Sequence, residues 1–354
     1  MYTYRLALIG FGNVGQGLTT ILRDHGLDLA RQHDVDFRIV AVNTARRGQV
    51  YDPEGLDPGI LLDTFKETGR VDVVPAPFTG WEVERVIRES NAEIIVECTS
   101  SDLFTGEPAN RFIREAIEQD RHVVTTNKGP VALHYPELST MAAERGVILG
   151  VEGTVMGGTP ALRVGRELLT TAGISRIQGI LNGTTNYIMT RMAEGESYEL
   201  ALREAQNKGY AEANPRSDVE GYDSAIKLVI LSNLMMGIPL KLHNVEREGI
   251  SELTTRDVVR AQQAGEVWKL VAWIERSEDV VKACVQPVRL PMNHPLASVS
   301  GAMNALTFVT KLLGDVTILG PGAGRVETGY GVLSDLLDIH HRSVSRLQDT
   351  YAHY

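Results

Sequence analysis

Three glycines near the N-terminus constrain the fold of this 354-residue chain more than any other feature. They stand in Gly10-Phe-Gly12-Asn-Val-Gly15, which follows an apolar strand pattern at residues 5–9 and opens a helical pattern at residues 14–29. In such a motif the first glycine allows a tight turn, the second lets the backbone approach a pyrophosphate, and the third lets helix and strand pack closely. A glycine-rich turn that binds nothing is the alternative. The spacing favours a dinucleotide site formed by Gly10, Phe11, Gly12, Asn13, Val14 and Gly15.

The first 150 residues alternate short apolar runs with helical patterns. Strands separated by helices in this order predict an α/β fold with a parallel, doubly wound sheet of the Rossmann type. We expect strands at residues 5–9, 37–42, 93–97, 122–126 and 147–151. We expect helices at residues 14–29, 82–90, 108–119 and 136–145.

The pattern changes after residue 151, where a loop rich in glycine and threonine begins. Strands are then grouped together beside longer helices, which predicts a second, α+β domain. Its strands are expected at residues 175–181, 268–274 and 280–290. Its helices are expected at residues 161–169, 198–208, 221–236 and 253–264, with another opening at residues 184–186 and a last helix at residues 332–340.

Composition excludes several classes of function. Lys plus Arg number 35 and Asp plus Glu 45, so the net charge of −10 disfavours general binding to nucleic acid or anionic membranes. Two cysteines, Cys98 and Cys284, are too few for a disulfide framework or a Cys-rich zinc site, and predict a reducing cytoplasm. The N-terminus lacks a signal-peptide pattern, and the most apolar stretch, residues 225–240, is too short and polar to cross a bilayer.

The end of the second strand selects the cofactor. NAD sites usually place a carboxylate there to hold the ribose hydroxyls. This strand ends instead in Asn43-Thr-Ala-Arg46-Arg47. A carboxylate would repel the additional phosphate of NADP and arginines would bind it, so we expect a preference for NADP over NAD. Two solvated loop arginines are the alternative interpretation.

Polar residues follow the third and fourth strands, at the sheet edge where ligands bind. Thr99 and Ser100 are expected to line a nicotinamide pocket. Cys98 is either a nucleophile that forms a thioester or, as we favour, a small core residue. Lys128 is a solvated turn residue if taken alone, but at this edge it becomes a candidate ligand for an anionic or carbonyl substrate.

Asp223 and Lys227 are four residues apart and share one face of a predicted helix. A surface salt bridge is the common interpretation of such a pair, but this helix is apolar nearly all round and is therefore expected to be buried. A buried lysine must be paired or functional, and it can pass a proton while a hydride moves to or from a nicotinamide. Glu212 and Asp218, on the preceding loop, suit a substrate ammonium. The residues predict a dehydrogenase for a small charged alcohol.

At this point the sequence resembles homoserine dehydrogenase over nearly its whole length. The most specific matches are Asn-Gly-Thr-Thr-Asn-Tyr-Ile (182–188) and residues 209–227. Supporting matches are the glycine motif at 10–15, Thr-Asn-Lys-Gly (126–129), Val-Glu-Gly-Thr-Val-Met-Gly-Gly-Thr-Pro (151–160) and Gly-Pro-Gly-Ala-Gly (320–324). The resemblance implies reversible oxidation of L-homoserine to L-aspartate 4-semialdehyde with NAD(P), on the route to threonine, isoleucine and methionine.

The resemblance also implies residue roles. It makes Lys227 and Asp223 the catalytic pair, assisted by Lys128, and it makes Glu212, Asp218, Tyr210, Gly183 and Thr184 substrate contacts. It places a monovalent cation, Na⁺ or K⁺, at Glu152, Val155, Gly157 and Thr159, although such a loop is also an ordinary tight turn. Gly322 is expected to contact the cofactor. Residues 1–150 would bind the cofactor, residues 151–311 would bind substrate and form a homodimer or higher homo-oligomer, and residues 312–354 would return to the first domain.

The chain departs from many relatives. It ends soon after residue 340, so feedback inhibition through a C-terminal amino-acid-sensing domain is not expected. Arg325 follows the glycine turn where relatives often have smaller residues, and the sequence assigns it no role. Two other functions compete: a related NADP-dependent dehydrogenase for another small amino or hydroxy acid, and a non-catalytic sensor that binds NADP. The buried Asp–Lys pair argues against the sensor.

Overall fold

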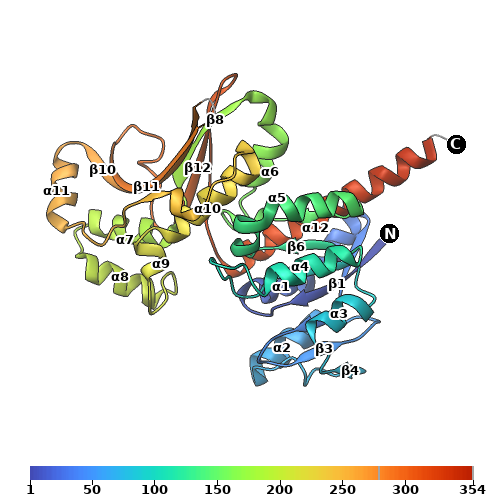
Figure 1. Ribbon diagram of the computed structural model, residues 1–354. Coiled ribbons are helices and arrows are strands. Elements are labelled where there is room, and N and C mark those ends of the chain that lie inside the picture. Colours follow the sequence, from blue (N-terminus) through green and yellow to red (C-terminus); the bar gives the residue numbers. More distant parts are fainter. Residues whose placement is uncertain (278–279, 353–354) are drawn as a thin grey trace. The chain divides into compact units, whose positions relative to one another are not determined.

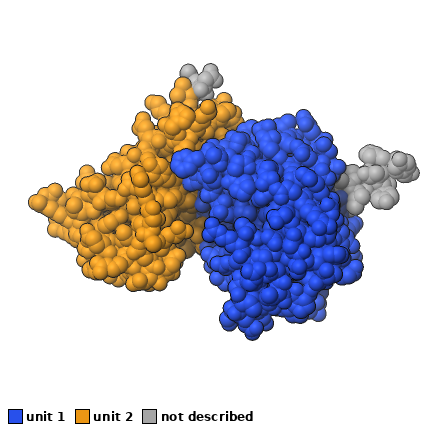
Figure 2. Space-filling view, turned by 60° about the horizontal axis from the view of Figure 1, so that its bottom comes forward, with its two compact units in different colours: residues 1–158, 324–354 blue, residues 159–323 orange. Residues whose placement is uncertain are grey.

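The structure is a computed structural model that describes residues 1–277 and 280–352. It comprises two compact units (Figure 1; Figure 2). The first unit contains residues 1–158 and 324–354, and the second contains residues 159–323. Each unit is built on its own sheet. Within the described residues, no helix is both long and apolar enough to cross a membrane.

The sheet of the first unit has seven strands in the order β4-β3-β2-β1-β5-β6-β7. Strands β2, β1, β5, β6 and β7 are parallel to one another. Strands β3 and β4 extend the sheet beyond β2 in antiparallel pairing. In chain order the elements are β1 (Tyr2–Ile9), α1 (Asn13–His33), β2 (Val35–Asn43), β3 (Gln49–Tyr51), α2 (Pro58–Thr68), β4 (Phe78–Thr79), α3 (Val83–Glu89), β5 (Ile94–Glu97), α4 (Ala109–Glu118), β6 (His122–Thr125), α5 (Lys128–Arg145), β7 (Leu149–Gly150) and α12 (Arg325–Ala352).

Alternation along β1 shows why this sheet is covered on both faces. Leu6 and Leu8 pack in one apolar cluster with residues of α1, α2 and α12. Ala7 and Ile9 point the other way, into a second cluster with residues of α3, α4 and α5. Because successive side chains of a strand face opposite sides, a wholly apolar strand needs helices on both faces. The predicted doubly wound α/β fold is confirmed.

The second unit has a six-stranded sheet in the order β13-β12-β8-β10-β11-β9. Its pairs are antiparallel except for β11 with β9. Its elements are α6 (Ala161–Arg163), β8 (Ile174–Ile180), α7 (Gly183–Ala193), α8 (Tyr198–Asn207), α9 (Arg216–Val219), α10 (Tyr222–Leu231), β9 (Glu246–Arg247), α11 (Thr255–Gln263), β10 (Glu266–Ser277), β11 (Val280–Pro291), β12 (Met303–Thr310) and β13 (Gly314–Pro321). The expected α+β class is confirmed for this unit.

The unit boundaries lie later in the chain than residues 150 and 311, where the sequence suggested them. The loop that follows β7 stays with the first unit as far as Gly158. Residues 312–323 do not return to the first unit, because β13 pairs with β12 from Thr310↔Gly314 to Met303↔Pro321. The returning segment is therefore α12, which begins at Arg325 rather than at residue 332.

Two glycines set the packing of α12 on α1 inside the first unit. A Cβ atom on Gly17 would lie 1.9 Å from the carbonyl oxygen of Arg325, and one on Gly329 would lie 2.6 Å from the carbonyl carbon of Gly17. The two helices therefore meet backbone to backbone. Gly26 lies further along α1, where a Cβ would meet nothing within 4 Å.

This difference gives a paired prediction about stability. Gly17→Ala should lower the free energy of unfolding by about 1–3 kcal/mol, because the added methyl group forces α12 away. Gly26→Ala should raise it by about 0.5–1 kcal/mol, because alanine loses less backbone freedom in a helix. Thermal and denaturant unfolding of both variants measure the effects. A Gly17→Ala variant as stable as Gly26→Ala would contradict the close contact.

Candidate active site

The glycine motif lies between the end of β1 and the start of α1, and each glycine has a different surrounding. Gly10 has a φ of +105°, and a Cβ there would lie 2.4 Å from the Cys98 carbonyl oxygen. At Gly15 a Cβ would lie 2.7 Å from the Gly10 carbonyl oxygen. At Gly12, the N-cap of α1, a Cβ would meet nothing within 4 Å, and no side chain caps the helix. The open space at an uncapped helix N-terminus fits a pyrophosphate group.

The other residues of this motif are divided between core and surface. Phe11 is 3% exposed, and its ring meets Phe65 edge-on at 5.0 Å, so its side chain is part of the core. Val14 packs against the same cluster. Asn13 is exposed at the first position of α1, where its Oδ1 accepts a hydrogen bond of 3.4 Å from Arg325. Arg325, unexplained by the sequence, is thus a cation at the N-terminal end of α1.

The turn after β2 carries more charge than the sequence pattern indicated. Arg46 and Arg47 are both exposed, and the Arg47 guanidinium lies 5.3 Å from the centre of the Phe65 ring. The backbone of Val71 donates to the Arg47 carbonyl at 2.8 Å, which brings Arg70 and Asp72 beside the turn. The Asp72 carboxylate lies against Gly48 and accepts from Arg70 at 2.9 Å. Sequence reasoning missed Asp72, because it is distant in the chain from the end of β2.

A buried carboxyl group organises the ends of β5 and β6. Glu97 is fully buried, accepts from the Thr99 N–H at 2.9 Å, and accepts from the Thr125 hydroxyl at 2.8 Å. Burial raises the pKa of Glu97, while the hydrogen bonds from Thr99 oppose that rise. The Asn127 N–H donates to the Thr125 hydroxyl at 3.0 Å, and Asn127 is the N-cap of α5. Glu97 was not predicted, although a charged residue ending an apolar strand is a visible signal.

This network fixes two segments that the sequence assigned to the cofactor or substrate. Thr99 is held directly by Glu97. The Ser100 carbonyl accepts a hydrogen bond of 3.4 Å from the Asn127 side chain. Lys128 is the first residue of α5, and its N–H donates to the Ser101 hydroxyl at 3.3 Å. All of these residues lie at the carboxyl edge of the first sheet, as predicted.

The thiol of Cys98 lies in the same region but faces the backbone. It donates to the Gly10 carbonyl oxygen at 3.2 Å. Burial raises the pKa of Cys98 well above its ordinary value, and the nearby charge of Glu97 raises it further. Since the thiolate is the nucleophile, these surroundings favour the core role over the thioester chemistry.

The predicted Asp–Lys pair of α10 is present and buried. The side chains of Lys227 and Asp223 are 8% and 13% exposed, and Lys227 Nζ lies 2.7 Å from Asp223 Oδ2. Lys227 also donates to the Leu181 carbonyl oxygen at 2.6 Å, at the end of β8. The helix α10 lies against β10 and β11 of the second sheet (Figure 1). The alternative of a surface salt bridge is excluded by this burial.

Asn182 completes the cluster and was missed by the sequence analysis. Its Nδ2 donates to Asp218 Oδ1 at 2.7 Å and to Asp223 Oδ2 at 2.9 Å. Its Oδ1 caps α7 by accepting from the Thr185 N–H at 2.8 Å. One amide therefore holds two carboxylates and a helix start together. Its place just before the predicted helix was the signal that could have identified it.

The remaining substrate-site predictions lie around the same end of α7. Gly183 is the first residue of α7, and the Thr184 hydroxyl donates to the Tyr210 carbonyl oxygen at 2.6 Å. The Tyr210 ring packs on Tyr187 at 5.0 Å and remains 45% exposed. Glu212 is exposed on the loop that precedes α9, where its carbonyl accepts from Gln206 at 3.1 Å. The structure thus brings Lys227, Asp223, Asp218 and the start of α7 together, with Tyr210 beside them.

The predicted cation loop follows β7. Glu152 is buried, and its N–H donates to Asp335 at 2.9 Å. Met156 and Gly157 both have positive φ angles, so the chain turns sharply between Val155 and Gly158. Carboxylate and carbonyl oxygens are hard ligands that suit an alkali cation. The Thr159 hydroxyl, the last proposed ligand, donates to the Pro321 carbonyl oxygen at 3.1 Å.

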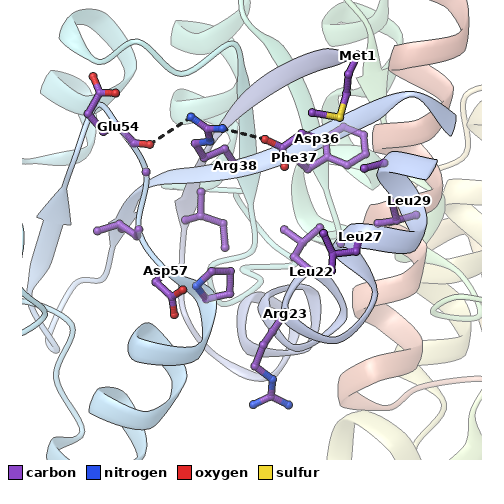
Figure 3. A pocket seen from close by; sticks show the side chains of 16 residues that line it. Met1, Leu22, Arg23, Leu27, Leu29, Asp36, Phe37, Arg38, Glu54 and Asp57 are labelled. Atoms are coloured by element: carbon purple, nitrogen blue, oxygen red, sulfur yellow. Dashed lines mark hydrogen bonds and ion pairs between the residues drawn. The ribbon is translucent and has the colours of Figure 1, made fainter. Parts of the chain in front are cut away.

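A groove of about 560 Å³ on the first unit lies away from these residues (Figure 3). It is lined by α1, the first half of β2 and residues 54–58, with Leu22, Leu27 and Phe37 among its apolar side chains. Ligands of doubly wound sheets bind at the carboxyl ends of the strands. The groove lies toward the amino end of β2 and contains none of the predicted site residues.

A dinucleotide-binding sheet together with a buried lysine–carboxylate cluster defines an NAD(P)-dependent oxidoreductase. Two family models cover most of the chain: "Homoserine dehydrogenase, NAD binding domain" matches residues 10–152, and "Homoserine dehydrogenase" matches residues 160–337. The chain belongs to the homoserine dehydrogenase family.

Individual relatives agree with the family models. The chain is 39% identical to an NAD(+)-dependent homoserine dehydrogenase of Pseudomonas canavaninivorans, over 99% of this chain and 100% of the relative. It is similar to the crystal structure of a putative homoserine dehydrogenase from Archaeoglobus fulgidus, with a TM-score of 0.85, 34% identity, and coverage of 95% and 99% of the two chains. It is also similar to a hyperthermophilic archaeal homoserine dehydrogenase mutant in complex with NADPH, with a TM-score of 0.82, 28% identity, and coverage of 96% and 98%.

The surroundings of Cys98 predict an unreactive thiol. At pH 8, iodoacetamide should modify Cys98 of the native protein more than about tenfold more slowly than it modifies glutathione, because each unit by which a pKa is raised removes about nine tenths of the thiolate. Mass spectrometry of the native and the urea-unfolded protein measures this, and Cys98→Ala should keep most of its turnover. Rapid alkylation accompanied by a parallel loss of activity would restore the thioester mechanism.

Proposed function

We propose that Lys227 transfers the proton in an enzyme that interconverts L-homoserine and L-aspartate 4-semialdehyde with NAD(P), in threonine, isoleucine and methionine biosynthesis. The observation that carries this proposal is the buried Lys227 ammonium held 2.7 Å from Asp223. An ammonium has three N–H donors, and two point at Leu181 and Asp223. We infer that the third donates to a substrate oxygen.

The reaction divides between a proton and a hydride. The bound nicotinamide supplies or accepts the hydride. In the direction of reduction, Lys227 donates a proton to the aldehyde oxygen as the carbon–oxygen double bond is reduced to an alcohol. In the direction of oxidation, neutral Lys227 accepts the hydroxyl proton. Asp223 holds the Lys227 amine in place through their contact of 2.7 Å.

The other predicted residues bind and orient the substrate. Glu212, with Tyr210, is proposed to hold the amino end of homoserine through charge and hydrogen bonding. Gly183 and Thr184 are proposed to hold the carboxylate at the N-terminal end of α7, where helix N–H groups favour an anion. Asp218 orients Asn182 and contributes negative charge near the ammonium. Lys128 is proposed to assist at the reacting oxygen.

Replacement of the lysine tests the proposal. Lys227→Met should lower kcat by about 10²–10⁴-fold, because the proton no longer has an acceptor or donor, while cofactor affinity should stay nearly unchanged. The assay follows nicotinamide absorbance with L-homoserine and either cofactor, and cofactor binding is measured by fluorescence. Lys208→Met, on the surface of the same unit, is the matched control. A nearly normal rate for Lys227→Met would refute this role.

The same assay separates the competing functions. Turnover of a different amino or hydroxy acid in preference to homoserine would favour a related dehydrogenase. Binding of the cofactor by the wild-type protein without turnover of homoserine or aspartate semialdehyde would favour a sensor.

The proposed preference for NADP rests on the charge at the turn after β2. Arg46 and Arg47 are exposed in this turn, and the carboxylate that lies beside it, that of Asp72, is already paired with Arg70. The excess of positive charge at this turn favours binding of the additional phosphate of NADP. The two relatives differ in this respect, since the Pseudomonas enzyme is called NAD(+)-dependent and the archaeal structure contains NADPH.

A double substitution measures this preference. Arg46→Ala/Arg47→Ala should raise KM for NADP about tenfold or more, because charge-assisted hydrogen bonds to the phosphate are lost, and should change KM for NAD little. Arg23→Ala, an exposed arginine of α1 in the same unit, is the control. An unchanged ratio of kcat/KM for the two cofactors, or a wild type that is faster with NAD, would overturn the preference.

Three further features belong to the proposal. A monovalent cation, Na⁺ or K⁺, at the Glu152 loop is supported by its oxygen donors. A homodimer or higher homo-oligomer is supported by β13, an edge strand of the second sheet on which Leu319 is 57% exposed. A cytoplasmic location is supported by the free thiols of Cys98 and Cys284.

A further inference from the structure

Arg325 is the first residue of α12, and its side chain extends along α1 toward the glycine motif. Its Cγ would lie 3.4 Å from a Cβ on Gly17. Its Nη2 lies 3.4 Å from the Oδ1 of Asn13, which is about one helical turn nearer to the N-terminus of α1. The guanidinium is therefore beside the first turn of α1.

The packing of α12 on α1 directs this side chain. Residues 325 and 329 are four apart, so they share one face of α12, and both meet Gly17. The contact is made by backbone on each side, because a Cβ on Gly17 would lie 1.9 Å from the Arg325 carbonyl oxygen. Arg325 is therefore anchored at its own Cα, and only its flexible end can move at the N-terminus of α1.

Arg325 is a cation without a carboxylate partner in the described part of the chain, where its side chain donates to Asn13 alone. The first turn of α1 contains no acidic residue. The carboxylate of Glu327 lies against Gly324, and residues two apart on a helix do not face each other. Most of the guanidinium N–H donors are therefore available to another acceptor.

The charge of a dinucleotide exceeds what the helix alone can neutralise. Each phosphate of the pyrophosphate carries a negative charge, whereas a helix N-terminus supplies the equivalent of about half a positive charge. The turn leaves room for such a group, since a Cβ on Gly12 would meet nothing within 4 Å. An arginine beside it adds a full charge and a planar set of donors that matches phosphate oxygens.

We propose that Arg325 is a further cofactor-binding residue, which donates hydrogen bonds to the pyrophosphate at the N-terminal end of α1. NAD and NADP share the pyrophosphate, so Arg325 strengthens the binding of both and does not select between them. It differs in this from Arg46 and Arg47, which we propose to contact the additional phosphate of NADP. The helix α12, from the end of the chain, thereby takes part in binding the cofactor.

The test measures binding to the enzyme without homoserine. Arg325→Met removes the charge and keeps most of the length of the side chain. It should raise the Kd of NADH and of NADPH by the same factor, about tenfold or more, because charge-assisted hydrogen bonds are lost. Nicotinamide fluorescence measures both constants. Arg31→Met, at the exposed C-terminal end of the same helix α1, is the matched control and should change neither.

Competition against NADPH separates a charge effect from a distorted site. Arg325→Met should raise the Ki of ADP, which has the two linked phosphates but no additional phosphate, and should leave the Ki of adenosine unchanged. Arg325→Lys keeps the charge without the planar set of donors, so its Kd values should lie between those of the wild type and the methionine variant. The lysine variant also provides the comparison if the methionine variant does not fold.

Three outcomes would overturn the inference. Equal weakening of ADP and adenosine would indicate a structural role, weakening of NADPH alone would indicate a contact with the additional phosphate, and unchanged Kd values would indicate no contact. None of these measurements needs turnover. A wild type that binds both cofactors but does not oxidise homoserine would contradict the proposed function and still allow Arg325 to be tested.

Discussion

The burial of the Lys227 ammonium determines which elements of the second unit must lie together. An isolated charge in an apolar interior is too costly to persist, so Lys227 must have partners, and it has the Asp223 carboxylate and the carbonyl at the end of β8. Asp223 in turn needs a donor other than the lysine, and Asn182 supplies it. These hydrogen bonds and the ion pair link α10, the end of β8 and the start of α7 without any bound ligand.

The start of α7 is where most of these hydrogen bonds meet. Asn182 caps the helix and ties it to the carboxylates, while one turn later Asn186 ties it to residues 301–303 and, through Lys269, to Val299. Two amides at helical spacing therefore face different partners. The proposed carboxylate site lies at the same turn, so this site and the lysine that we propose to transfer the proton share a single rigid support.

Much of this could be predicted from the sequence, wherever the signal was local. The glycine motif, the apolar strands of the first sheet and the Asp223–Lys227 spacing each depend on residues close together in the chain. Strands β3 and β4 were not predicted because they have only three and two residues. Strands β12 and β13 were not predicted because pairing with β8 and with each other, rather than a pattern of their own, places them in the second sheet. Glu97 and Asn182 have significance only through contacts with residues far away in sequence.

The turn after β2 shows why a local pattern gives an incomplete account of electrostatics. The sequence pattern concerns only the residue at the end of β2. The binding energy of a phosphate depends on every charge within several ångströms. Asp72 reaches this turn from a segment that pairs with Arg47 through the backbone, and it brings Arg70 with it. Asp72 is paired with Arg70, and Arg46 and Arg47 remain the proposed contacts for the additional phosphate of NADP. The preference for NADP therefore stays a prediction, and the pairing of Asp72 with Arg70 does not oppose it.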